Sequence, residues 1–113
     1  MLSTSKINYD EDGSIGYIES IYFSDNVLKS TYFPKTRMLY ISFNRGGTYS
    51  YSNISEELFD QFEQAESQGV FFHKNINKKV SYPQRKEFTL YPEELIEIKN
   101  KRNNIISDES NES

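Results

Sequence analysis

The stretch Met38–Gly69 constrains the fold of this chain most strongly, because it contains two strand patterns, a turn and a helix pattern in succession. Apolar residues occupy every second position of the segment 39–43, which is the period of a half-buried strand. The residues 44–47, Asn-Arg-Gly-Gly, tolerate a positive φ and suit a tight turn. The segment 48–52 then returns as the partner strand. We therefore expect a β-hairpin here.

A helix pattern follows the hairpin directly. Ser55 offers a capping side chain, and two glutamates follow it in the first turn, where the helix dipole favours anions. Leu58, Phe62 and Ala65 have helical spacing, and Gly69 is suited to end a helix in a left-handed conformation. We predict one main helix over 55–68, with its apolar face against the sheet.

The remaining segments carry weaker signals. Residues 1–13 are polar and expected to be frayed, whereas 14–23 and 27–33 have strand patterns, the second closed by Pro34. Further along, Phe88, Leu90 and Tyr91 are expected to form a short strand or extended arm. Pro92 opens a second helix to about Arg102, with Leu95 and Ile98 on its apolar face, and the tail 107–113 is acidic and expected to be disordered.

These patterns predict an α+β fold, namely a small antiparallel sheet of three to four strands packed on one main helix, with a C-terminal helical extension. We divide the chain into an N-terminal extension with a strand (1–23), a central domain (24–84), a C-terminal arm and helix (85–106) and a disordered acidic tail (107–113).

Composition limits the chemistry that this chain can perform. With no cysteine, the chain has no disulfide framework and no thiolate metal site, and with one histidine it cannot build a site that needs two imidazoles. We expect no catalytic residues, no metal and no cofactor. No secretory apolar segment and no run of 18 apolar residues is present, so we expect a cytoplasmic protein with no membrane partner.

Two tyrosines in the hairpin are candidate ligand-binding residues. Tyr49 and Tyr51 lie two apart on a predicted strand, so their rings stand on one face of the sheet. Exposed rings of this kind stack on nucleobases, and Arg45 in the turn is placed to meet a phosphate. Alternatively, both rings cover the core-facing side of the sheet, and the register of the hairpin decides between these interpretations.

A basic cluster after the main helix completes the candidate site. A nucleic acid could bind the cations of this cluster through its phosphates, and such binding weakens as the salt concentration rises. The alternative is a solvated amphipathic segment, which the pI of about 5.0 and the net charge of -4 favour. The polar and basic candidates of this cluster are His73, Lys74, Asn75, Lys78 and Lys79.

The chain resembles the KTSC family, which is named for the C-terminal domain of certain lysyl-tRNA synthetases. The family hallmark is a central Tyr-x-Tyr, here Tyr49-Ser50-Tyr51, followed by a helix and an Ala-x-Ser-x-Gly-x-Phe-Phe stretch, here 65–72. The chain departs from the family at Ser55, where proline is common, and at His73, where asparagine is common. Other residues that carry the resemblance are Asn26, Val27, Tyr32, the segments 39–43 and 47–51, and Ile76.

The resemblance implies a small α+β domain, with RNA binding as the suggested role. We therefore expect a non-catalytic module that recognises RNA or a nucleotide ligand. The alternative is a small phage or bacterial accessory protein that binds a protein partner, such as a host or defence factor, through Leu95, Ile98 and the acidic tail.

Overall fold

The computed structural model describes the backbone of residues 1–112 and the side chains of residues 1–103. Nine elements follow one another along the chain. They are β1 (Leu2–Tyr9), β2 (Ile15–Tyr22), β3 (Val27–Phe33), β4 (Met38–Phe43), β5 (Gly47–Tyr51), α1 (Glu56–Gln64), α2 (Gln68–Asn75), β6 (Gln84–Thr89) and α3 (Pro92–Glu112). No helix among the described residues is both long enough and apolar enough to span a bilayer.

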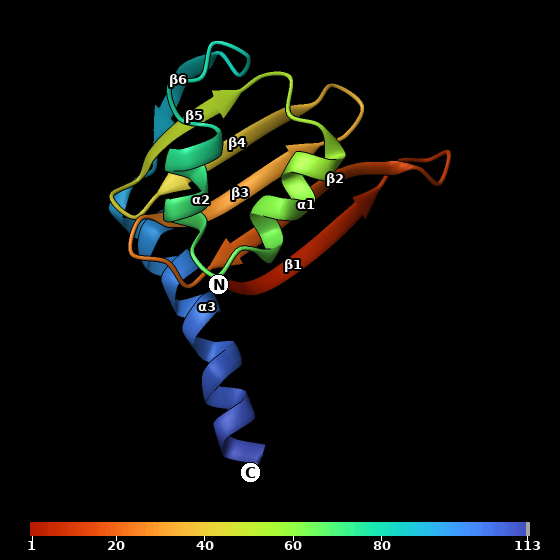
Figure 1. Cartoon of the computed structure of the whole chain (residues 1–113). Helices are drawn as coiled ribbons and strands as arrows, with labels where there is room; N and C mark the ends of the chain where they lie inside the picture. Colours follow the sequence, from red (N-terminus) through yellow and green to blue (C-terminus); the bar gives the residue numbers. More distant parts are fainter. Residues whose placement is uncertain (113) are drawn as a thin grey trace.

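The six strands form one antiparallel sheet in the order β1-β2-β3-β4-β5-β6, so every strand pairs with its neighbour in sequence. Helices α1 and α2 lie on one face of this sheet (Figure 1). Helix α3 starts beyond β6 and packs on the opposite face, where Glu97 and Ile98 line a hollow with Glu19 of β2 and Lys29 of β3. The α+β class is confirmed, but the sheet has six strands rather than three to four.

The main helix predicted over 55–68 ends earlier than expected, at Gln64, and a second short helix begins at Gln68. Ser55 caps α1 by accepting a hydrogen bond from the Leu58 amide at 3.0 Å. The chain then leaves the helical conformation at Ala65, whose ψ is 142°. Ser67 caps α2 in the same way, accepting from the Val70 amide at 3.2 Å. Gly69 therefore lies inside α2 instead of ending the first helix.

A buried glutamine explains why the break is stable. Gln68 is fully buried, and its Nε2 donates to the Phe62 carbonyl at 3.2 Å and to the Ala65 carbonyl at 2.9 Å. Carbonyls at the end of a helix lack intrahelical partners, and an internal donor satisfies them without water. This side chain thus links the end of α1 to the start of α2.

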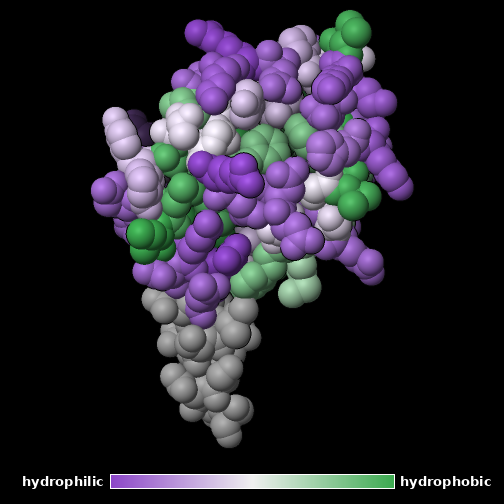
Figure 2. Space-filling model, turned by 90° about the vertical axis from the view of Figure 1, so that its left-hand side faces the viewer, coloured by the Kyte–Doolittle hydropathy of each residue, from purple (hydrophilic) through white to green (hydrophobic). Residues whose placement is uncertain are grey.

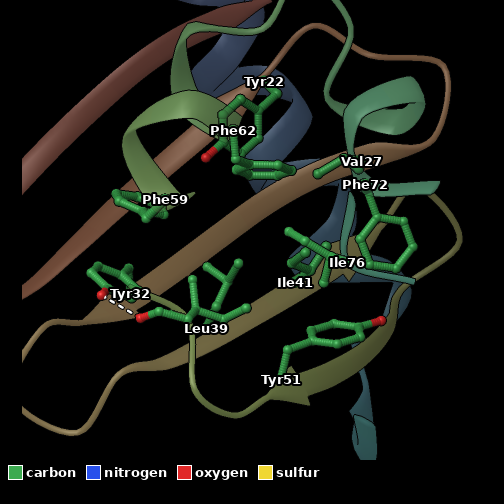
Figure 3. Close-up of a cluster of buried hydrophobic side chains, with 11 residues drawn as sticks. Tyr22, Val27, Tyr32, Leu39, Ile41, Tyr51, Phe59, Phe62, Phe72 and Ile76 are labelled. Carbon is green, nitrogen blue, oxygen red and sulfur yellow. Dashed lines mark hydrogen bonds between the residues drawn. The ribbon is translucent and has the colours of Figure 1, made fainter. Parts of the chain in front are cut away.

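The core between the sheet and these two helices is mainly aromatic (Figure 3). Tyr32 stacks on Phe59 with ring centroids 4.4 Å apart, and its hydroxyl donates to the Ile54 carbonyl at 2.7 Å. Tyr22 meets the edge of Phe62 at 5.4 Å. Pairs of this kind add about 0.5–1.5 kcal/mol beyond the area they bury.

The two ends of the chain differ most from their predictions. Residues 2–9, expected to be frayed, form β1 and pair with β2. Helix α3 continues to Glu112, well beyond the expected end at Arg102. The prediction of a disordered acidic tail at 107–113 falls on residues whose side chains, and for Ser113 the backbone as well, lie outside the described residues.

Candidate nucleic-acid interface

The register of the β4–β5 hairpin decides the orientation of the two candidate tyrosines. Leu39 lies opposite Tyr51 and Ile41 lies opposite Tyr49, so the tyrosines share the face of the apolar residues of β4. That face lies under α1 and α2. The interpretation in which Tyr49 and Tyr51 form an outward-facing platform is therefore wrong.

Tyr51 belongs to the core. It is 1% exposed, and its ring meets the edge of the Phe72 ring of α2 at 5.3 Å. Burial, with a smaller effect of the neighbouring Tyr49, raises the pKa of the Tyr51 phenol well above its ordinary value. A ring enclosed in this way has no free face on which a nucleobase could stack.

Tyr49 lies at the margin of the core and is half-buried. Its ring meets the edge of Phe43 at 5.9 Å, and the Nζ atom of Lys86 lies 5.2 Å from its centroid. An ammonium group above an aromatic face is attracted by the ring quadrupole. Tyr49 is therefore the one tyrosine of the pair that meets both the core and a surface cation.

Arg45 is exposed in the turn between β4 and β5, and a glycine fixes that turn. Gly46 has a φ of +100°, and a Cβ atom at this position would lie 3.0 Å from the Leu90 carbonyl oxygen. The Gly46 carbonyl also accepts a hydrogen bond from the Leu90 amide at 2.9 Å. The turn is thus tied to the segment that follows β6, which holds the backbone of Arg45 in place.

His73 lies in the last turn of α2, where its exposed side chain is placed between two amides. Its Nε2 lies 3.5 Å from Asn26 Nδ2, and its Nδ1 lies 3.2 Å from Asn77 Nδ2. Asn75 instead donates to the Phe71 carbonyl at 3.0 Å, so its amide already serves its own helix. Of the two predicted site residues His73 and Asn75, only His73 contacts polar side chains of other segments at the surface.

The basic side chains gather on the side of the molecule formed by β5, β6 and α2. All are exposed, and none forms an ion pair with a described residue. Figure 2 looks onto this side and shows mainly hydrophilic side chains across it. We call these residues the basic side, and its members are Arg45, Lys74, Lys78, Lys79 and Lys86.

Lys86 was absent from the residues that the sequence singled out as a site. Its position comes from the pairing of β5 with β6, in which Lys86 lies opposite Tyr49. The sequence signal for β6 was weak, because charged residues dominate 84–87. The position of Lys86 beside Tyr49 follows from the register between β5 and β6, which the pattern of a single sequence does not give.

The opposite face of the sheet holds an aromatic row that the sequence analysis also missed. Tyr17 lies 5.6 Å from Phe33, and Phe33 lies 5.7 Å from Tyr40. Phe33 and Tyr40 line a shallow groove of about 230 Å³ together with Phe88 of β6. The alternation of the segment 39–43 already predicts this position for Tyr40, because it places the Tyr40 ring on the sheet face opposite to that of Leu39 and Ile41.

Glu66, Ser67 and His73 are close in sequence, but Ser67 serves as the cap of α2 and His73 contacts Asn26 and Asn77. Among the described residues, no group of three or more histidine or carboxylate side chains could hold a metal ion.

Comparisons with known proteins agree on the central part of the chain. A family model for the KTSC domain matches residues 23–82. A crystal structure of a KTSC domain protein from Yersinia pestis is similar, with 34% identity and a TM-score of 0.58, and the similarity covers 62% of this chain and 96% of that chain. No curated protein matches. The matched residues contain β3, β4, β5, α1 and α2, whereas β1, β2, β6 and α3 lie outside them.

Proposed function

Since this chain belongs to the KTSC domain family, we propose that it is a non-catalytic module of that family that binds RNA or a nucleotide through its basic side. Phosphates contact the lysines and arginine of the basic side, and the exposed edge of Tyr49 lies beside them. The buried Tyr51 supports the fold beneath this surface.

One observation carries the proposal, namely the five cations of the basic side that have no carboxylate partner among the described residues. Two cations elsewhere are paired within the fold, Lys29 with Glu19 at 2.6 Å and Lys35 with Asp10 at 2.5 Å. A cation without an internal partner retains its charge for a ligand. Replacing its counterions by phosphates releases those counterions and favours binding at low salt.

The arrangement of these cations suits an extended anion. Arg45 precedes the first residue of β5 and Lys86 lies beside its centre. Lys78 and Lys79 lie in the loop before β6, at the other end of β5, where Asn53 donates to the Ser81 carbonyl at 3.3 Å. A strand of this length spans about 17 Å. A single-stranded RNA of a few nucleotides reaches all of these positions.

The net charge of -4 does not oppose this proposal at the surface concerned. Two of the anions, Asp10 and Asp12, surround Lys35 at the far end of the sheet. Charges more than about 10 Å apart are largely screened at 0.1 M salt. The local positive charge of the basic side therefore attracts a short anion in spite of the negative net charge of the chain.

Charge reversal on the basic side tests the proposal. We expect Lys74→Glu with Lys79→Glu to weaken binding of a labelled single-stranded RNA about tenfold or more in low-salt fluorescence anisotropy. The matched control is Lys99→Glu with Lys101→Glu on α3, which changes the net charge equally and leaves the affinity near that of the unaltered chain. Equal losses in both variants, or no binding by the unaltered chain, would contradict the proposal.

A second candidate function is binding to a protein partner through the C-terminal segment. Leu95 and Ile98, predicted as its contacts, are half-buried, and Ile98 lines the hollow against the sheet. The specific observation in favour is that Phe88, Tyr91 and Ile96 are exposed where β6 passes into α3. Exposed apolar side chains that lie together mark interaction sites.

The two candidate functions respond to different substitutions. If a protein partner binds this segment, Tyr91→Ala with Ile96→Ala abolishes its capture, whereas Val80→Ala, a control at an exposed apolar loop residue, does not. Capture that is lost in the Lys74→Glu and Lys79→Glu variant instead would place the partner on the basic side.

A further inference from the structure

The two edges of the sheet differ in how they are protected. β6 carries the consecutive charged residues Arg85, Lys86 and Glu87, and its pairing with β5 contains a register shift. Charges and irregularities of this kind discourage a further strand from pairing. β1 is the outermost strand on the other side, and Figure 1 shows no helix beyond it.

β1 has fewer charges than β6, although its pairing with β2 also contains register shifts, between Leu2 and Thr4 and between Asn8 and Tyr9. It is eight residues long, contains no proline and has Lys6 as its one charged residue. Ile7 is 44% exposed and Tyr9 is 66% exposed. A long edge strand with exposed apolar residues is a template for pairing with another strand.

The apolar residues of β1 extend the core to this edge. Ile7 lies opposite Ile18 of β2, and Tyr9 lies opposite Ile15. Ile18 in turn packs against the buried cluster beneath the helices. The apolar layer on this face therefore continues across β2 to β1, where its last side chains, Ile7 and Tyr9, are partly exposed.

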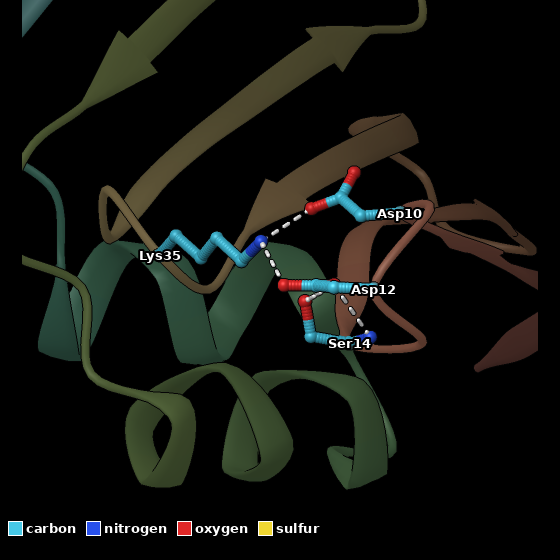
Figure 4. Close-up of polar contacts among 4 residues, drawn as sticks. All are labelled: Asp10, Asp12, Ser14 and Lys35. Carbon is cyan, nitrogen blue, oxygen red and sulfur yellow. Dashed lines mark hydrogen bonds and ion pairs between the residues drawn. The ribbon is translucent and has the colours of Figure 1, made fainter.

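Polar contacts hold the end of the β1–β2 hairpin in place (Figure 4). Lys35, in the turn between β3 and β4, lies 2.5 Å from Asp10 Oδ2 and 3.9 Å from Asp12 Oδ2. Asp12 accepts hydrogen bonds from the Ser14 amide at 3.0 Å and from its hydroxyl at 2.6 Å. The edge strand is thus presented in a fixed orientation, which lowers the entropic cost of pairing.

We propose that β1 pairs with β1 of a second copy of this chain, antiparallel about a two-fold axis, to give one continuous sheet. A two-fold axis perpendicular to the sheet keeps the helix-covered faces of both copies on the same side. With the axis at Ile7, this residue meets Ile7 of the partner subunit, and Lys6 lies opposite Asn8 of the partner subunit. Apolar side chains then face each other at the centre, and no like charges are paired.

The sequence of β1 is self-complementary about Ile7, which suits a second copy of this chain. Placing the axis at Lys6 would oppose two lysines, whereas the axis at Ile7 buries two isoleucines and leaves polar pairs beside them. The regular part of the edge between the two register shifts is Thr4–Asn8, so the interface is small. It falls below the area of about 1,200 Å² that is typical of tight complexes, and the dimer dissociates on dilution.

Sedimentation of the full chain over a range from about 10 µM to about 1 mM tests this dimer, because weak dimers populate in this range. We expect the mean mass to rise towards that of a dimer with concentration. Ile7→Lys places like charges at the axis and keeps the chain monomeric throughout. Val80→Lys, which adds the same charge at a residue 97% exposed, leaves the association unchanged. A wild-type chain that stays monomeric, or a dimer that survives Ile7→Lys, overturns the proposal.

A cross-linking experiment tests the register and does not depend on the folding of the lysine variant. The chain has no cysteine, so Ile7→Cys introduces a single thiol, and directly opposed residues of an antiparallel pair come close enough for a disulfide. We expect mild oxidation to yield a disulfide-linked dimer of Ile7→Cys at least tenfold faster than of Val80→Cys. Equal rates would overturn the proposed register, and a captured foreign peptide in place of the dimer would overturn the choice of occupant.

Discussion

Tyr49 lies directly opposite Ile41 in the pairing of β4 with β5, and this relationship fixes the face of both hairpin tyrosines. Because side chains alternate along a strand, Tyr51 follows Tyr49 to the same face, opposite Leu39. A shift of one residue would have exposed both rings. The hairpin that carries the family hallmark is therefore part of the scaffold of the domain, with Tyr49 at the margin of the core.

The first prediction concerns the unequal burial of the two tyrosines. We expect Tyr51→Ala to lower the free energy of unfolding by about 3–5 kcal/mol, as large aromatic truncations in a core do. Tyr49→Ala is expected to cost about 1 kcal/mol, because its ring is half-buried. Urea unfolding followed by circular dichroism measures both. Similar losses in the two variants would contradict the assignment of Tyr51 to the core.

The central hairpin was predictable from the sequence because local signals agree there. The alternation in 39–43, the glycines at 46 and 47 and the return strand all indicate the same structure, and the structure has β4 and β5 at these positions. The register was not predictable, since the composition of the turn allows more than one pairing. The exposure of Tyr49 and Tyr51 depends on that register. The sequence could therefore identify these two candidate residues but could not predict which face of the sheet they occupy.

The elements that the sequence analysis missed depend on distant partners. β1 has a polar sequence, and it is a strand because β2 pairs with it. The break between α1 and α2 depends on the buried side chain of Gln68, whose acceptors lie three and six residues earlier. The periodicity of apolar residues runs through this break, so the pattern alone predicted one helix.

The second prediction tests this break. Gln68→Leu keeps the approximate volume of the side chain but leaves the Ala65 carbonyl without its amide donor and the Phe62 carbonyl with only the Ala65 amide at 3.4 Å, which costs about 1–3 kcal/mol of stability. Gln64→Leu is the matched control, since Gln64 is an exposed residue of α1. Chemical denaturation of both variants provides the comparison. A Gln68→Leu variant as stable as the control would refute this role of the amide.

The third prediction concerns a carboxyl group under α1. Glu63 accepts a hydrogen bond from Ser20 at 2.5 Å, while burial is the main cause that raises the pKa of its carboxyl group. A carboxyl group whose pKa is raised on folding stabilises the protein below its unfolded pKa, and this stabilisation is lost as the pH rises through the folded pKa.

Glu63→Gln removes this dependence on pH. We expect the melting temperature of the variant, relative to that of the unaltered chain, to increase as the pH rises from about 4 to about 7. Thermal unfolding at several pH values measures the difference, and the other titrating groups affect both proteins alike. A difference that stays constant with pH, or that falls as the pH rises, would show that Glu63 is not destabilised by burial.

The fourth prediction separates backbone strain from steric contact at two glycines. Gly13 and Gly46 both have a positive φ, but a Cβ atom at Gly13 meets nothing within 4 Å, whereas one at Gly46 approaches the Leu90 carbonyl oxygen at 3.0 Å. We expect Gly13→Ala to cost about 1–2 kcal/mol through the left-handed conformation alone. Gly46→Ala should cost clearly more, as measured by denaturant unfolding. An equal cost would show that the backbone at Leu90 moves away from the added Cβ atom without a loss of stability.

The most direct test of the central claim is the salt dependence of RNA binding by the unaltered chain. For single-stranded RNA, the logarithm of the association constant falls with the logarithm of the salt concentration with a slope of about -0.7 per phosphate contact. If the five cations of the basic side bind phosphates, the slope lies between about -2 and about -3.5, and Lys74→Glu with Lys79→Glu makes it shallower by about 1.4. A slope near zero, or one that these substitutions leave unchanged, would contradict binding through the basic side.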